Sequence, residues 1–395
     1  MENIRRVQLS EIAELITKGT TPTTLGYEFQ DEGVNFLKIE CFDENGNYQP
    51  EKAAHISEEC NEKLKRSQLK AGDVLFSIAG AIGRVGIVTE EMLPANTNQA
   101  LAIIRINSDE VYLPYIKLIL TSPIVKKQFE KKKQGVAQLN LSLKDINELT
   151  IPLPAKDKQV EYAELFTKLG RILAHRKEEL ASLDELIKAR FVELFGSISN
   201  NKFGYEVMSL QDVCEPIKDG THQTPTYTED TVNGYKFLSS KDVTSGKVDW
   251  NHLKYIPEEL HKELYKRISP RKGDILLAKN GTTGVAAIVD RDDVFDIYVS
   301  LALLRPLGMV TSEYLCSAVN SIETKHQFDS SLKGIGVPNL HLGEIKKTKI
   351  VVPPIEAQEQ FADFVKQVDK SKVAVQKALD EAQLLFDSLM QEYFG

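Results

Sequence analysis

Two glycine-rich turns and seven histidines are the residues of this chain that could support phosphate or metal chemistry. The turns Gly80–Gly83 and Gly281–Gly284 resemble phosphate-binding loops, but β-forming residues follow both, whereas a phosphate-binding loop opens a helix. The histidines lack the short spacing of metal ligands. Both turns are therefore interpreted as tight connections between strands, and no metal is expected.

The sequence also lacks the motifs of phosphate-transfer and methyl-transfer enzymes. It contains no Gly-Lys-Ser/Thr loop and no Asn/Asp-Pro-Pro-aromatic motif for methylation of amino groups. No glycine-rich loop joins a strand to a helix where a methyl donor could bind. We therefore expect a protein that is not an enzyme by itself and needs no cofactor, and a self-sufficient nuclease or methyltransferase is disfavoured.

The segments that hold these turns occur twice in the chain. A shift of about 200 positions places the second half on the first in order, and the offset drifts only from 201 to 199. The matched segments include Leu9 with Leu210, Phe36-Leu37 with Phe237-Leu238, Lys70–Leu75 with Arg271–Leu276, Gln128-Phe129 with Gln327-Phe328, Asn140-Leu141 with Asn339-Leu340, and Phe195-Gly196 with Phe394-Gly395. Such a chain presents two similar modules, which we expect to contact two similar targets.

Length and composition indicate a globular protein of more than one domain. The 395 residues exceed what one hydrophobic core usually organises, and 42% of them are hydrophobic. The first residues lack the apolar core of a signal peptide, and no apolar run reaches the roughly 18 residues of a membrane span. Four scattered cysteines favour reduced thiols. A cytoplasmic protein with no membrane association is expected, and its net charge of −8 does not by itself indicate nucleic-acid binding.

The chain divides into two kinds of segment. Residues 1–155 and 197–354 mix short β-rich runs with Gly, Pro and Asn turns and one amphipathic helical stretch each, so we predict two similar α+β domains. Residues 156–196 and 355–395 instead carry apolar residues at alternating spacings of three and four, which is typical of a coiled coil. The predicted pairing seam consists of Phe166, Leu169, Leu173, Leu180, Leu183, Ile187, Leu194, Val365, Val368, Val375, Leu379, Ala382, Phe386, Leu389 and Tyr393.

The connection between the segments favours an antiparallel helix pair. Each helix of about 39 residues would be about 58 Å long. Only a short polar linker joins the first helix to the second domain, and the second helix begins where that domain ends. Parallel pairing would require the second helix to start a full helix length away, which a domain of about 150 residues does not span. The prediction is therefore two similar domains separated by a long antiparallel two-helix coiled coil with an internal pseudo-two-fold repeat. The alternative is that each helix packs only on its own domain.

The ordered motifs of the chain resemble those of the specificity subunits of type I restriction–modification systems. The first copy contains Val7–Leu9, Lys18–Pro22, Ala71–Leu75, Gly80–Arg84 and Ile151–Pro154, followed by Gln159 and a long helix; the second contains Met208–Leu210, Lys272–Leu276, Asn280–Gly284 and Val352–Pro354 with Gln358. The resemblance covers essentially the whole chain. Each motif alone is weak, but their duplication around two heptad helices is specific.

The resemblance implies functions for the four segments. Residues 1–155 and 197–354 would be target recognition domains, each reading one half of a split site on double-stranded DNA. Residues 156–196 and 355–395 would be the spacer helices, which set the distance between the half-sites and dock two modification (methyltransferase) subunits. Restriction subunits would join the larger complex.

Within that interpretation, DNA contacts are expected from polar side chains near the matched turns. Base edges are read chiefly by Arg or Lys at guanine and by Asn or Gln at adenine, while hydroxyls and lysines also bind phosphate. The loop from Lys18 to Thr24 is rich in hydroxyls, and Lys218–Thr224 is its counterpart. The candidate DNA contacts are Lys18, Thr20, Thr21, Lys38, Arg84, Asn96, Asn98 and Gln99 in the first domain, and Thr221, Ser240, Lys241, Lys279, Asn280 and Tyr298 in the second.

Alternatives to these contacts remain open at the level of sequence. The hydroxyl-rich loops could be ordinary solvated loops. The lysine run that includes Lys126, Lys127 and residues 131–133 could serve helix-end electrostatics rather than phosphate binding. A tandem-domain protein-interaction scaffold without DNA readout is the alternative function. Because the two copies differ most at the candidate positions, an asymmetric target is predicted.

Overall fold

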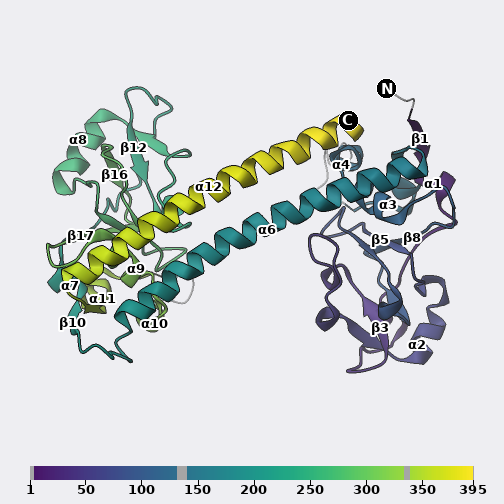
Figure 1. The fold of residues 1–395 in the computed structure, drawn as a ribbon, viewed down its shortest axis with the longest axis horizontal. Helices are drawn as coiled ribbons and strands as arrows, with labels where there is room; N and C mark the ends of the chain where they lie inside the picture. Colours follow the sequence, from purple (N-terminus) through teal and green to yellow (C-terminus); the bar gives the residue numbers. More distant parts are fainter. Residues whose placement is uncertain (1–3, 131–139, 333–338, 395) are drawn as a thin grey trace. The chain divides into compact units, whose positions relative to one another are not determined.

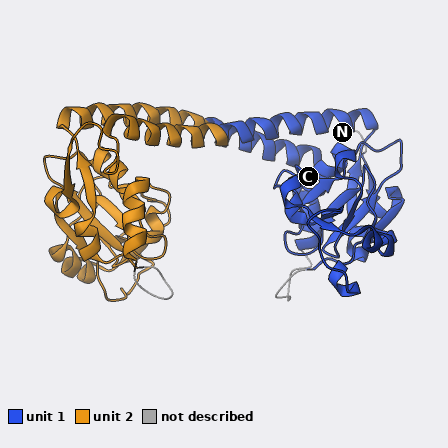
Figure 2. Ribbon diagram, turned by 90° about the horizontal axis from the view of Figure 1, so that it is seen from below, with its two compact units in different colours: residues 1–176, 378–395 blue, residues 177–377 orange. Residues whose placement is uncertain are grey.

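The computed structural model describes residues 4–130, 140–332 and 339–394. It divides into two compact units (Figure 2): unit 1 comprises Met1–Arg176 with Ala378–Gly395, and unit 2 comprises Lys177–Lys377. Each unit therefore contains one α+β domain, part of the first long helix and part of the second. Residues 131–133 of the lysine run lie outside the described residues.

Unit 1 is built on three small sheets (Figure 1). An antiparallel four-stranded sheet has the order β2 (Leu15–Lys18), β8 (Leu101–Arg105), β5 (Val74–Ser77), β6 (Val85–Ile87). A three-stranded sheet has the order β4 (Ala54–Ile56), β3 (Val34–Leu37), β7 (Ala95–Thr97), with β3 and β7 parallel. Strands β1 (Arg5–Gln8) and β9 (Thr150–Leu153) pair separately. The helices are α1 (Leu9–Ile12), α2 (Glu58–Lys63), α3 (Leu113–Leu120), α4 (Pro123–Glu130) and α5 (Leu143–Asn147), before the long α6 (Lys156–Phe195).

Unit 2 repeats this topology strand for strand. Its four-stranded sheet has the order β11 (Cys214–Asp219), β17 (Leu301–Pro306), β14 (Ile275–Ala278), β15 (Ala286–Ile288). Its three-stranded sheet has the order β13 (Lys254–Ile256), β12 (Tyr235–Leu238), β16 (Phe295–Ile297), and β10 (Glu206–Ser209) pairs with β18 (Lys349–Val352). The helices are α7 (Leu210–Val213), α8 (Glu258–Arg267), α9 (Ser312–Val319), α10 (Ile322–Ser331) and α11 (Leu342–Lys347), before the long α12 (Ile355–Phe394). The predicted fold class, two similar α+β domains with long helices, is confirmed.

The repeated Gly-Asp motif is a structural clamp between strands. Asp73 precedes the fully buried strand β5 and accepts hydrogen bonds of 2.7 Å from both Nε and Nη2 of Arg105 on β8. Asp274 and Arg305 form the same pair at 2.8 Å in unit 2. A bidentate Arg–carboxylate pair fixes geometry as well as charge, so it holds the start of β5 against the end of β8, the two central strands of the sheet.

A buried glutamine fastens the first turn of each long helix. The side chain of Gln159 accepts from the Tyr112 N–H at 2.9 Å and donates to the carbonyl oxygens of Glu110 at 2.9 Å and Pro154 at 2.8 Å. Gln358 makes the equivalent contacts with Thr311, Met309 and Pro353. Because this side chain satisfies backbone groups both before the long helix and before α3 or α9, the matched glutamines tie the helix to its domain and belong to the fold.

The two long helices run antiparallel, as contacts inside each unit show. In unit 1 the start of α6 meets the end of α12: the rings of Phe166 and Phe386 lie 5.2 Å apart, and those of Tyr162 and Tyr393 stack at 4.7 Å. In unit 2 the end of α6 meets the start of α12, where Phe191 and Phe361 lie 5.6 Å apart. The antiparallel pairing predicted from connectivity is confirmed within each unit.

The helix ends also enter the cores of their own units. Phe166 and Leu169 share the unit 1 core with Met390 and Phe394, while Phe191, Phe195 and Phe361 share the unit 2 core. None of the predicted seam residues is exposed. The alternatives of helix pairing and packing on the domain are thus combined, since the same helix turns do both.

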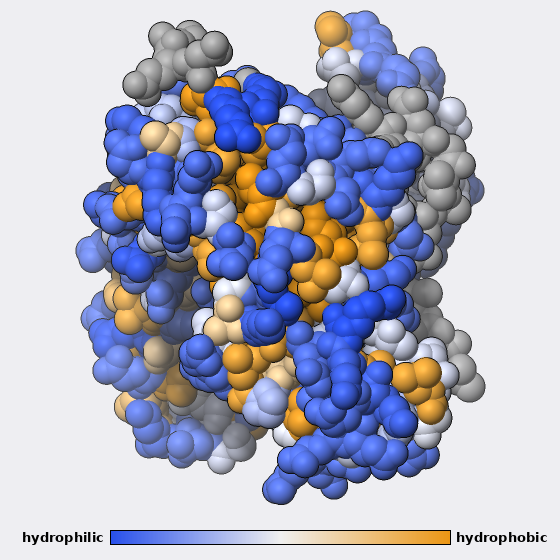
Figure 3. Space-filling model, turned by 90° about the vertical axis from the view of Figure 1, so that its right-hand side faces the viewer, coloured by the Kyte–Doolittle hydropathy of each residue, from blue (hydrophilic) through white to orange (hydrophobic). Residues whose placement is uncertain are grey.

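No helix among the described residues is long and apolar enough to cross a membrane. The face drawn in Figure 3 is mainly hydrophilic, with apolar side chains gathered in a band among hydrophilic ones. Apolar atoms normally contribute more than half of a folded protein's exposed area, so this band by itself marks no site.

Candidate nucleic-acid interface

The predicted contact residues of unit 1 gather where several strands end. Strands β2, β3, β5 and β7 finish together, and backbone hydrogen bonds join the residues after them: Gly19 N–H to Asn98 O at 3.1 Å, and Ile78 N–H to Ala100 O at 2.9 Å. We call this border, with residues 18–24, 38 and 98–100, the strand-end edge of unit 1. In unit 2 the same edge follows β11, β12, β14 and β16 and contains residues 219–224, 239–241, 279–280 and 298–300.

A glycine allows the hydroxyl-rich loop to approach the neighbouring strand. A Cβ added to Gly19 would lie 1.8 Å from the carbonyl oxygen of Thr97, and one added to Gly220 would lie 1.9 Å from that of Ile297. Only glycine fits such an approach, since a Cβ would overlap the backbone. The loop of unit 1 is fastened further by a hydrogen bond from the Thr21 hydroxyl to the Gln99 side chain.

The predicted contacts in unit 1 lie in different environments. Lys18, Thr20, Thr21 and Asn98 are half-buried and Gln99 is exposed, all at the strand-end edge. Lys38 is half-buried, with its Nζ 4.7 Å from the centre of the Phe29 ring. Arg84 donates from Nη1 to the carbonyl oxygen of Phe42 at 3.3 Å, so part of its hydrogen-bonding capacity serves the fold.

Asn96 is fully buried and joins a helix to a strand. Its Nδ2 donates to Asn61 Oδ1 at 2.8 Å and to the Leu64 carbonyl oxygen at 3.2 Å. In unit 2, strand register and helix position place His261 where unit 1 has Asn61, and Asp296 where it has Asn96. Nδ1 of His261 lies 2.7 Å from Asp296 Oδ2, so a charged or chargeable pair replaces the two amides.

The predicted contacts in unit 2 are also spread between surface and interior. Lys241 is exposed, Ser240 and Tyr298 are half-buried, and Thr221 is buried. The backbone N–H of Ser240 donates to Ser300 Oγ at 2.9 Å. Asn280 is half-buried, and its Oδ1 has no hydrogen-bond partner among the described residues.

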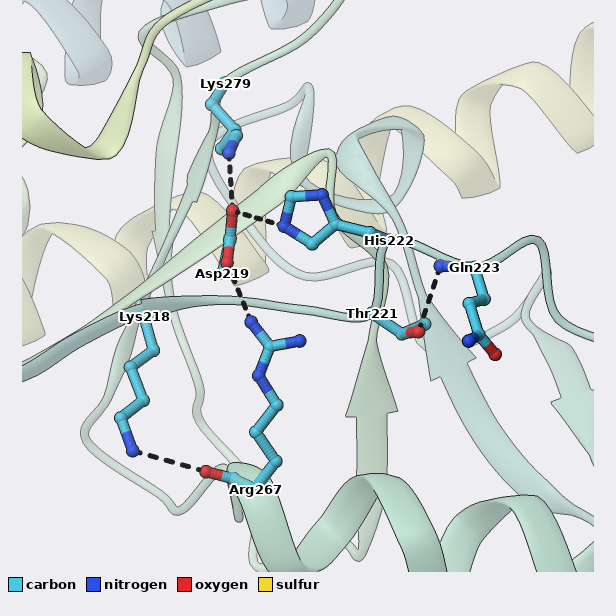
Figure 4. A network of polar contacts seen from close by, with 7 residues as sticks. All are labelled: Lys218, Asp219, Thr221, His222, Gln223, Arg267 and Lys279. Carbon is cyan, nitrogen blue, oxygen red and sulfur yellow. Dashed lines mark hydrogen bonds and ion pairs between the residues drawn. The ribbon is translucent and has the colours of Figure 1, made fainter.

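Lys279 belongs to a buried ionic network centred on Asp219 (Figure 4). Oδ2 of Asp219 lies 2.8 Å from Lys279 Nζ and 3.2 Å from His222 Nε2, and Oδ1 lies 3.2 Å from Arg267 Nη2. Burial acts to raise the pKa of Asp219, but the hydrogen bond and charge of Lys279, with smaller contributions from His222 and Arg267, hold this pKa below its ordinary value. The network fixes the end of β11, and with it the loop that follows Asp219, to the residue after β14.

Unit 1 has a basic residue at the position that the acidic Asp219 occupies in unit 2. Lys18 pairs in register with Ala102, and Asp219 with Ala302, so the structure aligns Lys18 with Asp219 rather than with Lys218. This corrects the loop alignment taken from sequence by one residue. Ile78 occupies the position of Lys279. Each follows its strand, and their backbone N–H groups donate to matching carbonyl oxygens, those of Ala100 and Ser300. The two edges therefore differ in charge as well as in shape.

The His261–Asp296 pair predicts a pH-dependent stability of unit 2. Burial raises the pKa of Asp296 to about 6, although the hydrogen bond from His261 opposes this. A carboxyl group whose pKa is higher in the folded state lowers the free energy of unfolding as pH rises from about 4 to about 6. Asp296→Asn removes that titration, so its stability relative to the natural chain should increase across this window.

Urea unfolding of both proteins at about pH 4.5 and about pH 6.5 measures this difference. Asp292→Asn, at an exposed aspartate of the same unit, is the control and should show no such trend. A stability difference between Asp296→Asn and the natural chain that is constant with pH would show that Asp296 does not titrate in this range.

One aromatic residue near each edge is absent from the predicted contacts. Phe29 is 37% exposed and Tyr227 is 42% exposed, and each precedes a residue that bridges to the neighbouring strand, Gln30 with His55 and Thr228 with Tyr255. Their offset is 198, outside the range of the sequence match. The hydroxyl-rich loop differs in length between the copies, so the sequence repeat alone does not align them.

Solved structures with this architecture identify the fold. One solved structure concerns complex assembly and conformational transition of the type I restriction–modification system. A chain of that structure aligns with a TM-score of 0.62 and 17% identity, over 99% of this chain and 97% of that one. The type I restriction–modification S subunit from M. genitalium aligns with a TM-score of 0.54 and 15% identity, over 100% and 97% of the chains. The chain thus has the fold of a type I specificity subunit.

Sequence comparison gives the family. The type I restriction modification DNA specificity domain matches residues 1–183 and 203–382, and the protein belongs to this family. The chain is 29% identical over 170 residues to the EcoBI specificity subunit of Escherichia coli, covering 42% of this chain and 35% of that protein. It is 23% identical over 322 residues to the MjaVIII specificity subunit of Methanocaldococcus jannaschii, covering 75% and 72%.

Proposed function

We propose that this protein is the DNA specificity subunit of a type I restriction–modification complex. The observation that carries the proposal is that two units of one topology each gather hydrogen-bonding side chains at the same strand-end edge, in a chain of the DNA specificity family. Lysines, hydroxyls and amides are the groups that contact phosphates and base edges. The chain itself supplies recognition and needs neither catalytic residues nor a cofactor for it.

The segments have separate roles in this proposal. Residues 1–155 and 197–354 are the target recognition domains, and each reads one half of a bipartite site on double-stranded DNA. Residues 156–196 and 355–395 form the spacer helices, which set the distance between half-sites and dock two modification subunits, while restriction subunits join the full complex. A complex that kept its spacer length after loss of one heptad from each helix would contradict the spacer role.

The two half-sites are proposed to differ in sequence. At matching positions unit 1 has the half-buried Lys18, whereas unit 2 has Asp219, a buried carboxylate paired with Lys279. Asn98 and Gln99 of unit 1 likewise stand where unit 2 has Tyr298 and Val299, as the flanking strands align. Side chains with different donors and acceptors select different bases, so the target is asymmetric.

Exchange of one domain tests this proposal. Residues 1–155 are replaced by the equivalent domain of a relative, and the hybrid is expressed with its modification subunits. Single-molecule methylome sequencing should then show a new sequence in one half-site and the original sequence in the other. A change in both halves, or in neither, contradicts the assignment of one half-site to each domain. Salt-dependent binding of the assembled complex to a specific duplex supports DNA readout, because DNA affinity falls steeply with salt, and its absence would favour a protein-interaction scaffold.

A further inference from the structure

Each unit presents an exposed aromatic ring together with a lysine beside its strand-end edge. In unit 1 the Nζ of Lys38 lies 4.7 Å from the centre of the Phe29 ring, and in unit 2 the Nζ of Lys254 lies 4.1 Å from that of Tyr227. Both distances are within the range of a cation–π interaction. We call these the aromatic–lysine pairs of the two units.

The rings occupy the same place in the two folds. Phe29 packs edge-on against Phe36 at 5.4 Å, and Tyr227 packs edge-on against Phe237 at 6.1 Å. Phe36 and Phe237 are the next-to-last residues of the matching strands β3 and β12. Each exposed ring therefore lies beside the carboxyl end of β3 or β12, next to the predicted contacts.

The lysines, in contrast, come from different strands. Lys38 follows the end of β3, where the sequence match gives unit 2 Ser239. Lys254 begins β13 and is opposite Phe237, where unit 1 has Ala54 opposite Phe36. The two units thus place an ammonium group over the equivalent ring, but the lysine comes from a different strand in each unit.

A comparison of the two units indicates which part of the DNA the aromatic–lysine pairs contact. At candidate DNA-contact positions the units differ: Asn98 and Gln99 of unit 1 stand where unit 2 has Tyr298 and Val299. The aromatic–lysine pair is retained. Two half-sites of different sequence have the sugar–phosphate backbone in common, so a retained feature suits the backbone and a divergent one suits the bases.

We propose that each aromatic–lysine pair binds the DNA backbone independently of sequence, the ammonium contacting a phosphate and the exposed ring packing against deoxyribose. This inference rests on the proposed DNA specificity function and adds to it the residues that anchor each unit on the duplex. The lysine remains a positive charge while it lies over the ring, and the half-exposed ring leaves apolar surface available to a sugar. Sequence selection is left to the other residues of the strand-end edge.

The test uses the full chain assembled with its modification subunits and carrying Lys38→Gln or Lys254→Gln. Affinity for a duplex with the recognised site and for an unrelated duplex should fall by the same factor, leaving their ratio unchanged. Loss of one phosphate contact should reduce the slope of log affinity against log salt by about 0.9. The natural complex should therefore lose about 3.5-fold more affinity than the variant between about 50 and 200 mM salt.

Matched controls are Lys70→Gln and Lys272→Gln. These exposed lysines precede β5 and β14, two strands whose other ends lie at the strand-end edges. Neither should change affinity or salt slope. Phe29→Leu keeps an apolar cover over Phe36 but removes the flat ring, and it should weaken both duplexes equally with an unchanged salt slope.

Two results would overturn the inference. If Lys38→Gln and Lys254→Gln behave like their controls, the pairs do not contact phosphate. If they alter the ratio between specific and unrelated duplexes, they read sequence instead. In both cases the natural complex still binds its site, so the DNA specificity function stands; failure of the natural complex to bind either duplex would contradict that function itself.

Discussion

Phe361→Ala is expected to destabilise unit 2 by about 3–5 kcal/mol, the usual cost of removing a buried phenylalanine. Phe361 is fully buried, and its ring lies 5.6 Å from that of Phe191 and 5.5 Å from that of Phe195. Those two rings pack in turn on Tyr314 of α9. One side chain thus joins both long helices to the domain core, so its loss leaves a cavity that three elements border.

Urea unfolding of the purified chain, followed by circular dichroism, measures the effect. Val373→Ala on the same helix is the control: Val373 is 69% exposed, and the substitution should change stability by no more than about 0.5 kcal/mol. If Phe361→Ala unfolds at the same urea concentration as Val373→Ala, the helix pair does not depend on the aromatic cluster and is held elsewhere along the seam.

The antiparallel helix pair was predictable because its signal is periodic and long. Apolar spacing over four heptads indicates a seam, and the short linker 197–202 leaves antiparallel pairing as the short connection. The deeper attachment through Phe191 and Phe361 was not predictable from that period. Phe191 lies outside the predicted seam, whereas Phe361 continues its spacing four residues before Val365 and meets Phe191 of the other helix. A heptad pattern indicates such a helix partner but carries no information about packing on the core of the domain.

The burial and hydrogen-bond partners of individual candidate residues were not predictable from the sequence. The sequence placed the candidates beside the matched turns, and the structure collects Lys18, Thr21, Asn98 and Gln99 at the strand-end edge. Residue type, however, does not reveal burial: an asparagine can read adenine or can bond to another asparagine, as Asn96 does with Asn61. Only the tertiary neighbours distinguish these roles.

Asp219→Ala is the second substitution expected to have a large effect, again about 3–5 kcal/mol. Lys279 is 6% exposed, and removal of its carboxylate partner leaves a buried ammonium group without a counter-charge. His222 and Arg267 should contribute less, since their side chains are 64% and 49% exposed and solvent screens them. The measurement is urea unfolding at neutral pH, with Arg267→Ala as the control of small effect.

Unit 1 provides the compensating change for this substitution. Ile78 is fully accommodated where unit 2 has Lys279, which shows that an apolar side chain fits this position in the fold. The double variant Asp219→Ala with Lys279→Ile should therefore recover most of the stability that Asp219→Ala loses, because a buried ion pair can be replaced by apolar residues at little cost. If the double variant is no more stable than Asp219→Ala, the loss comes from the missing carboxylate itself and its bonds to His222 and Arg267. Recovery of stability would show that the unpaired ammonium group of Lys279 causes the loss.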